Sequence, residues 1–132
     1  MYSLKVEGTF SSAHNLRGYK GRCEDLHGHN WRVEIVIKSE ELDDIGLVLD
    51  FKYLKKKLNV VLDEMDHKYL NKLVYFKKVN PTSENIAKYI YKKLQIKIPL
   101  LSSVIVWENS TSCAAYEPSP SKMSYGKKGR AG

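Results

Sequence analysis

Apolar and polar residues alternate along two stretches near the start of the chain. Residues 2–14 place a tyrosine, three apolar residues and a histidine on one face: Tyr2, Leu4, Val6, Phe10 and His14. Residues 27–38 place two histidines and four apolar residues on one face: His27, His29, Trp31, Val33, Ile35 and Ile37. Alternation with a period of two predicts a half-buried β-strand in each stretch. A glycine-containing loop over residues 15–26 would join the strands as an antiparallel pair.

Two later stretches have the period of a helix instead. Asp50 is a favourable helix N-cap, and apolar residues recur after it at helical spacing: Phe51, Leu54, Leu58, Val61, Leu62 and Met65. The turn of residues 80–85 offers Thr82 or Ser83 as the cap of a second helix. Its apolar positions are Ile86, Ile90 and Leu94, and Pro99 is expected to end it.

The remaining apolar segments predict strands. Residues 46–49 indicate a short strand or the end of one, and residues 103–109 and 112–117 indicate two more. The order of elements predicts an α+β fold, with two helices on one face of an antiparallel sheet. We expect one domain over residues 1–117, followed by a basic, disordered tail over residues 118–132.

Composition limits the cellular setting. No apolar run approaches the ~20 residues that a membrane-spanning helix needs, and the N-terminus begins with a strand pattern. We therefore expect a cytoplasmic protein without a membrane partner. Cys23 and Cys113 are expected to be reduced thiols, with Cys113 an inert packed residue.

The net charge of +7 raises the question of a nucleic-acid partner. Residues 118–132 hold four basic residues and no acidic one, so the tail accounts for much of the excess. The lysines of the two expected helices fit solvated outer faces. We expect no nucleic-acid partner, although a mildly positive field would favour an anionic substrate such as a phosphate ester.

Three of the four histidines fall on the apolar face of the two expected N-terminal strands. The side chains of His27 and His29 would leave the same face of a strand, ~6.6 Å apart. His14 would lie on the same face of the neighbouring strand, so all three rings could meet at one end of it. Three neutral imidazoles suit zinc with a fourth position open for water or substrate, and iron and copper also fit this chemistry.

Four further residues are candidates for catalysis or ligand binding. Cys23 precedes His27 by four positions, and a nearby metal would lower the pKa of its thiol; otherwise it is a small, partly buried apolar residue. Asp66 and His67 place a carboxylate beside an imidazole after the first helix, where a histidine also suits the helix dipole. Glu108 either reaches solvent or binds paired N–H groups of a ligand.

These residues belong to a set of ordered motifs. The set comprises residues 10–14 (FSSAH), Cys23 with residues 27–30 (HGHN), Asp50-Phe51, Asp66-His67 with Leu70-Asn71, residues 80–85 (NPTSEN) and Trp107-Glu108. Together they resemble the family of 6-pyruvoyltetrahydropterin and 6-carboxytetrahydropterin synthases. The resemblance covers residues 3 to about 117.

The resemblance implies roles for the matched residues. The family's zinc ligands are matched by His14, His27 and His29. Cys23 matches its catalytic base, and Asp66 and His67 match the remainder of its catalytic triad.

Substrate contacts follow in the same way. Glu108 matches the acid that anchors the pterin, sometimes described as part of a charge relay. Thr82 and Ser83 lie in the stretch that approaches the pterin ring in relatives.

The resemblance also implies an architecture. The family has the tunnelling fold (T-fold), in which each subunit offers a four-stranded antiparallel sheet with two helices on one side. Subunits join their sheets into a barrel, with active sites at the interfaces. A homo-oligomer, expected to be a hexamer, would therefore share catalytic groups between chains.

Motif spacing favours one branch of the family. Three residues separate Cys23 from His27, as in the carboxy enzymes of 7-deazapurine (queuosine and archaeosine) synthesis, whereas pyruvoyl synthases tend to have a longer insert. The implied reaction converts 7,8-dihydroneopterin triphosphate to 6-carboxytetrahydropterin, with loss of acetaldehyde and triphosphate. Arg17 or lysines could hold the triphosphate. The alternatives are a pyruvoyl-forming or side-chain-cleaving enzyme, a metal-dependent phosphohydrolase, and a zinc-stabilised RNA-binding module without enzymatic activity.

Overall fold

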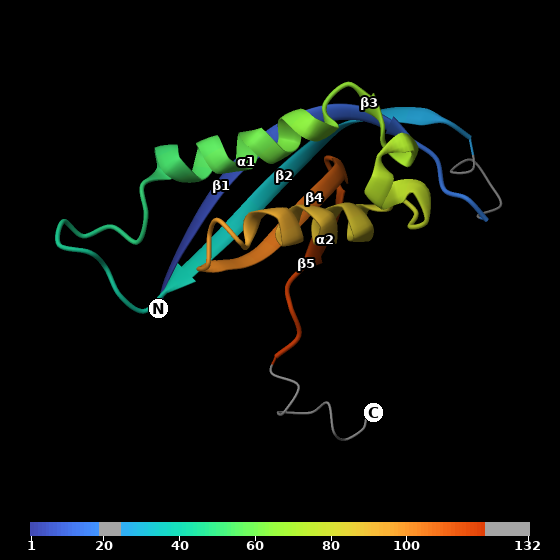
Figure 1. The fold of residues 1–132 in the computed structure, drawn as a ribbon. Coiled ribbons are helices and arrows are strands. Elements are labelled where there is room, and N and C mark those ends of the chain that lie inside the picture. Colours follow the sequence, from blue (N-terminus) through green and yellow to red (C-terminus); the bar gives the residue numbers. More distant parts are fainter. Residues whose placement is uncertain (19–24, 121–132) are drawn as a thin grey trace, which may run out of the picture.

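The computed structural model describes residues 1–18 and 25–120, which form one sheet with two helices on the same face (Figure 1). The sheet order is β3-β1-β2-β4-β5. The strands are β1 (Tyr2–His14), β2 (His27–Ser39), β3 (Lys68–Tyr69), β4 (Leu101–Asn109) and β5 (Ser112–Tyr116). The helices are α1 (Phe51–Met65) and α2 (Ser83–Leu94), with short 3-10 helices η2 (Leu70–Lys72) and η3 (Val74–Lys77) between them. The α+β class predicted from the sequence is confirmed.

The hairpin of β1 and β2 is the longest pairing in the sheet. Its antiparallel register runs from Tyr2 opposite Ser39 to His14 opposite His27. The predicted alternation is confirmed, because the apolar positions of β2 from Trp31 to Ile37 are fully buried beneath the helices. The histidines at the end of the hairpin therefore continue the helix-covered face.

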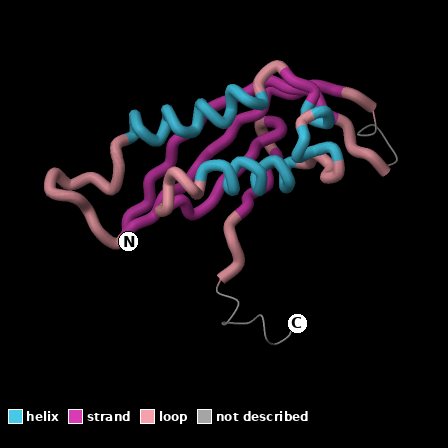
Figure 2. Tube along the Cα trace, in the orientation of Figure 1, coloured by secondary structure: helices cyan, strands magenta, loops and turns pink. Residues whose placement is uncertain are grey.

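Both helices begin at the predicted caps. The carboxylate of Asp50 accepts from the N–H of Lys52 at 2.8 Å, and the hydroxyl of Thr82 accepts from the N–H of Asn85 at 3.1 Å. The predicted apolar faces are buried, except that Phe51 in the first turn of α1 is 54% exposed. Figure 2 shows the two helices as one layer over the strands.

The expectation that Pro99 ends α2 was wrong, since the helix ends at Leu94. The N–H groups of Lys97 and Ile98 both donate to the carbonyl of Leu94, which closes the helix in a tight turn. That turn brings Ile98 into the core, where it is fully buried.

The expected strand over residues 46–49 is absent from the described chain. Asp43 replaces a strand partner there, because its carboxylate accepts from the N–H groups of Ile45 and Leu47. Gly46 has a φ of 89°, a conformation that suits a turn and not a strand.

The sheet has five strands instead of the expected four, and one pairing is parallel. His67 has a φ of 54° and donates its N–H to the carbonyl of Ser11, which turns the chain along the edge of β1. Lys68 and Tyr69 then pair in parallel with Ser12 and Ala13. This two-residue strand has no periodic signal in the sequence.

Cys113 is exposed, so the expectation of a packed residue was wrong. It lies opposite Trp107, on the sheet face that the helices leave uncovered. Cys23 and residues 121–132 of the expected tail lie outside the described residues. In the described part of the chain, neither helix has the length and apolar character needed to cross a membrane.

Candidate metal centre and active site

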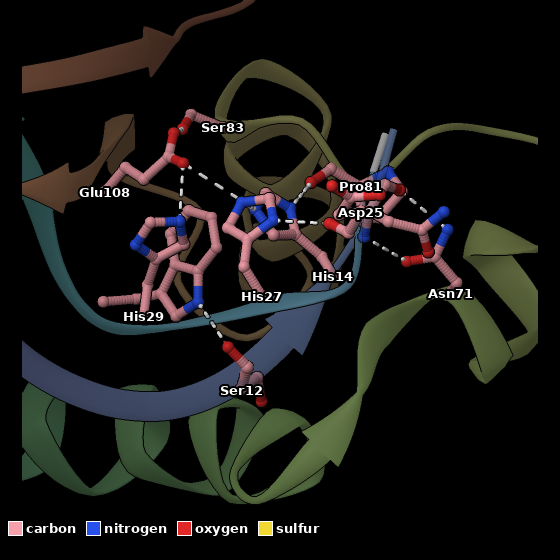
Figure 3. Close-up of polar contacts among 11 residues, drawn as sticks. Ser12, His14, Asp25, His27, His29, Asn71, Pro81, Ser83 and Glu108 are labelled. Atoms are coloured by element: carbon pink, nitrogen blue, oxygen red, sulfur yellow. Dashed lines mark hydrogen bonds and ion pairs between the residues drawn. The ribbon is translucent and has the colours of Figure 1, made fainter. Parts of the chain in front are cut away.

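The end of the β1–β2 hairpin brings three histidines together. His14 is the last residue of β1 and lies opposite His27, the first residue of β2. His29 follows two positions later on the same face. Figure 3 shows the three rings and the Glu108 carboxylate turned toward one another. The convergence predicted from strand phase is confirmed by this arrangement.

The nitrogen and oxygen atoms of this cluster are close enough to share one ion. The Nε2 atoms of His14 and His27 lie 3.0 Å apart. One ligand atom from each of the three histidines and from Glu108 can be chosen so that all four lie within 4.8 Å of one another. These four residues are hereafter the ligand cluster.

Backbone carbonyls fix the tautomers of two rings. The Nδ1 atom of His14 lies 2.7 Å from the carbonyl oxygen of Pro81, and Nδ1 of His27 lies 2.7 Å from that of Asp25. A carbonyl can only accept, so each Nδ1 carries the proton and each Nε2 presents a lone pair. This arrangement is typical of metal-binding histidines, whose other ring nitrogen donates to a carbonyl or carboxylate.

Burial favours the neutral form of His14 and His29. Burial lowers the pKa of His14 below its ordinary value of 6.5, although the hydrogen bond to the Pro81 carbonyl opposes the shift. Burial is also the largest influence on His29, whose pKa is lowered although Glu108 opposes the shift. Neutral imidazoles are the form that binds metals, so at pH 7 these rings are ready to do so.

His29 contributes a buried nitrogen without a hydrogen bond. Its Nε2 lies 2.8 Å from Oε2 of Glu108, but the contact lacks hydrogen-bond alignment and the atom has no hydrogen-bond partner. An unsatisfied buried nitrogen is costly unless another group binds it. The Nε2 atom of His29, together with the facing Nε2 lone pairs of His14 and His27, shows that the cluster fits a divalent cation.

Glu108 reaches the cluster from β4, which pairs with β2. Its Oε2 is 3.7 Å from Nε2 of His14, and Ser83 at the start of α2 donates to its Oε1 at 3.3 Å. The hydroxyl of Thr82 is engaged as the helix cap. Glu108 was predicted from the sequence as a ligand-binding acid, but its place beside the three histidines was not, because strand order is not encoded in local periodicity.

Asp66 and His67 lie elsewhere. Asp66 accepts from the N–H of Ser11 at the outer edge of β1, and His67 is 82% exposed with its Nε2 3.5 Å from Asp66. Asp66 and the N–H of His67 both bind the backbone of Ser11 on the edge of β1 that faces β3, which is the edge away from β2 and β4. The described chain therefore does not bring this pair into the ligand cluster. An open hollow of about 520 Å³ adjoins His67, lined by residues that include Gly28 and Lys68.

Arg17, a candidate for binding triphosphate, is engaged within the fold. Its guanidinium donates to the backbone carbonyl of Phe76 and contacts the side chain of Asn80 and the carbonyl of Asn71. Asn71 and Asn80 were not identified as functional by sequence reasoning, although both lie in the motifs that carry the family resemblance.

Comparison with known proteins places this site in a family. The family described as "6-pyruvoyl tetrahydropterin synthase" matches residues 3–119. A relative from Synechocystis named "6-carboxy-5,6,7,8-tetrahydropterin synthase" is 38% identical, over 88% of this chain and 93% of its own length. A relative from Pyrococcus furiosus named "Dihydroneopterin monophosphate aldolase" is 35% identical, over 77% of this chain and 85% of its own length.

The fold agrees with these matches. The solved structure of 6-pyruvoyl tetrahydropterin synthase from Caenorhabditis elegans aligns with a TM-score of 0.81 at 31% identity, covering 89% of this chain and 96% of that one. The T-fold expected from the motifs is thereby confirmed. The chain belongs to the 6-pyruvoyl tetrahydropterin synthase family of enzymes that act on pterins.

Proposed function

We propose that this protein is a zinc-dependent 6-carboxy-5,6,7,8-tetrahydropterin synthase. The substrate would be 7,8-dihydroneopterin triphosphate, and the products 6-carboxytetrahydropterin, acetaldehyde and triphosphate, with one water taken up. As a lyase of this kind it would serve 7-deazapurine synthesis. The observation that carries the proposal is the ligand cluster, in which the carboxylate of Glu108 lies beside three imidazoles.

Two further observations support the carboxy branch. The Synechocystis relative with this name is similar over nearly all of its length. The three-residue spacing between Cys23 and His27 resembles that of the carboxy enzymes.

The residues that match the family motifs would each have a role in this reaction. Glu108 would accept hydrogen bonds from the exocyclic amine and a ring N–H of the pterin, a paired contact that a carboxylate makes well. Ser83, which donates to Glu108 in the structure, would orient that carboxylate, and Thr82 would contact the ring edge beside it.

Proton transfer would involve groups on two sides of the substrate. Cys23, as a thiolate, would remove a proton from the side chain. His67, paired with Asp66, would exchange protons on the other side. General acid–base groups of this kind typically contribute about 10²–10⁴ in rate each.

The metal would be held by His14, His27 and His29. When bound, zinc supplies a Lewis acid that lowers the pKa of the substrate's side-chain hydroxyls. The Pro81 and Asp25 carbonyls keep two of these imidazoles in the required tautomer.

The separation of Asp66 and His67 from the ligand cluster supports a site shared between chains. Within the described residues, β1 has a strand partner on its outer edge only at Ser12 and Ala13, and β5 forms the opposite edge of the sheet. Pairing β1 of one subunit with β5 of the next would place the Asp66–His67 pair of one chain near Glu108 of its neighbour. We propose that the protein is a homo-oligomer, a hexamer, with active sites at these interfaces.

Mass spectrometry of the products tests the proposal directly. Zinc-loaded protein incubated with 7,8-dihydroneopterin triphosphate should yield carboxytetrahydropterin and acetaldehyde. A pyruvoyl product would keep the site but assign the protein to the other branch. Absence of any reaction would contradict the assigned substrate.

A second function has its own support. The Pyrococcus relative is named for cleavage of dihydroneopterin monophosphate, which breaks a bond in the same side chain. Offering the monophosphate in parallel distinguishes the two, because an aldolase would release a two-carbon aldehyde from it and leave the pterin at the dihydro level.

A further inference from the structure

The chain leaves the sheet after His14, yet its next residues keep the pairing pattern of a strand. The N–H of Asn15 donates to Oδ1 of Asn71 at 3.0 Å, and Nδ2 of Asn71 donates to the carbonyl of Asn15 at 2.9 Å. Arg17 and Asn80 exchange the same two bonds, at 3.0 and 2.9 Å. In antiparallel strands, alternate residues exchange both backbone bonds with a partner strand in this way. Here two side-chain amides replace the partner strand.

This pairing requires a side-chain amide, which asparagine supplies. Its amide presents one acceptor and one donor, whereas aspartate lacks the donor and alanine lacks both. The orientation of each amide is fixed, because an N–H must meet Oδ1 and a carbonyl must meet Nδ2. Asn71 is only 8% exposed, and its loss would leave part-buried backbone groups of Asn15 unpaired.

The amide pairing is tied to a candidate metal ligand. Asn80 immediately precedes Pro81, whose carbonyl accepts from Nδ1 of His14 at 2.7 Å. The chain from His14 to Arg17 is therefore attached to residues 80–81 at both of its ends. Asn85 in α2 donates to the carbonyl of Asn80 at 3.0 Å and anchors the whole arrangement to the helix.

Additional contacts brace the same segment. The hydroxyl of Tyr69 donates to Oδ1 of Asn15 at 2.6 Å. The guanidinium of Arg17 contacts Oδ1 of Asn80 at 3.4 Å. Figure 3 shows Asn71 and Pro81 on the side of His14 away from Glu108.

We propose that Asn71 and Asn80 are positioning residues for the metal site. By pairing with Asn15 and Arg17, they hold the Pro81 carbonyl where it orients the His14 imidazole, with Nε2 toward the other ligands. The inference rests on metal binding by the histidines, which is part of the proposed function. It assigns a role in metal binding to two residues that lie outside the ligand cluster.

The test measures metal binding and requires no turnover. Zinc affinity is determined by competition with a chromophoric chelator, and the visible absorption of the Co²⁺-loaded protein reports ligand geometry. Asn80→Ala should weaken zinc binding about 10-fold, the lower end of the effect of losing an outer partner of a ligand, and should change the Co²⁺ spectrum. Asn71→Ala should act in the same direction. Asn80→Asp keeps the acceptor and loses the donor, so its effect should be intermediate.

Two control variants separate positioning from general destabilisation. Asn59→Ala removes an exposed asparagine from α1, and Ile98→Val truncates a buried residue after α2. Both should match the wild type in zinc affinity and Co²⁺ spectrum, at a temperature where circular dichroism shows all variants folded. If Asn71→Ala does not fold, the half-buried Asn80 variants decide the question.

If Asn80→Ala binds zinc within about threefold of the wild-type affinity and its Co²⁺ spectrum is unchanged, the inference is wrong. The proposed function would still stand. If the wild-type protein binds neither ion, the proposed function and the inference fail together. The two failures are therefore distinguishable.

Discussion

His14 and His27 face each other with their Nε2 atoms 3.0 Å apart, although the Nδ1 atom of each ring already contacts a backbone carbonyl. Two neutral rings with protonated Nδ1 atoms cannot hydrogen-bond through Nε2, so their lone pairs oppose each other. A shared cation removes that conflict. With these tautomers, both Nε2 lone pairs are available to a metal.

Replacing His29 should separate metal binding from the rest of the fold. His29→Ala removes the buried nitrogen without a hydrogen bond and should weaken zinc binding by at least about 10-fold, as is typical when metal coordination is disturbed. Elemental analysis after dialysis measures the zinc content. His67→Ala is the matched control and should retain zinc, because His67 lies outside the ligand cluster. Equal zinc loss in both variants would contradict the assignment of ligands.

Glu108→Gln distinguishes two roles for the acid. If Glu108 binds the pterin, the variant should keep its zinc and lose pterin affinity, because an amide nitrogen replaces one of the two acceptor oxygens. Fluorescence titration with a pterin and elemental analysis give the two readouts. Loss of zinc with pterin affinity retained would show instead that Glu108 is a fourth metal ligand.

Cys23→Ala should leave zinc content intact and reduce turnover by about 10²–10⁴, the usual contribution of a general base. Product formation from the triphosphate substrate measures this effect. Unchanged turnover would remove Cys23 from the mechanism.

Mixing two inactive variants tests the shared site. His29→Ala and His67→Ala chains, unfolded together in equal amounts and refolded with zinc, should regain about a quarter of the wild-type activity. Each shared site needs an intact His29 from one chain and an intact His67 from its neighbour, and random assembly in a closed oligomer gives that combination about a quarter of the time. Each variant refolded alone provides the baseline. No gain on mixing would place all the catalytic groups within one chain.

The metal-free protein should lose stability in mild acid. Burial lowers the pKa of His14 and His29 in the folded state, so below about pH 6.5 the unfolded chain binds more protons than the folded one. The free energy of unfolding should therefore decrease as pH falls below about 6.5 and level off above it. Urea unfolding of chelator-treated protein at pH 7.5 and 5.5 measures this difference. His14→Gln, which cannot titrate, should show a smaller dependence, and equal stability of the wild type at both values would contradict the prediction.

Periodicity predicted the elements that bury one regular face. β1, β2, both helices and their caps follow directly from alternation, helical spacing and the residues Asp50 and Thr82. The elements that were missed depend on single contacts: β3 exists because His67 turns the chain along β1, and residues 46–49 form a turn because Asp43 binds their N–H groups. Such contacts leave no repeating signal.

The candidate site was predictable to a similar degree. The phase of His14, His27 and His29 on two adjacent strands was sufficient to bring them together. The place of Glu108 beside them depends on β4 pairing with β2, a long-range contact that no local pattern specifies. The contact between the Pro81 carbonyl and His14 could not be predicted from the sequence either, because every residue has a backbone oxygen.

The hairpin register also bears on the order of events during synthesis. The three imidazoles lie within the first 29 residues, whereas Pro81 and Glu108 emerge much later. Local contacts form faster than distant ones, so the hairpin can present its imidazoles before the helical layer has folded. An ion captured at that stage would be selected by intrinsic affinity, in which copper exceeds zinc. Metal identity in the cell would then depend on which ion is available while the chain is still being made.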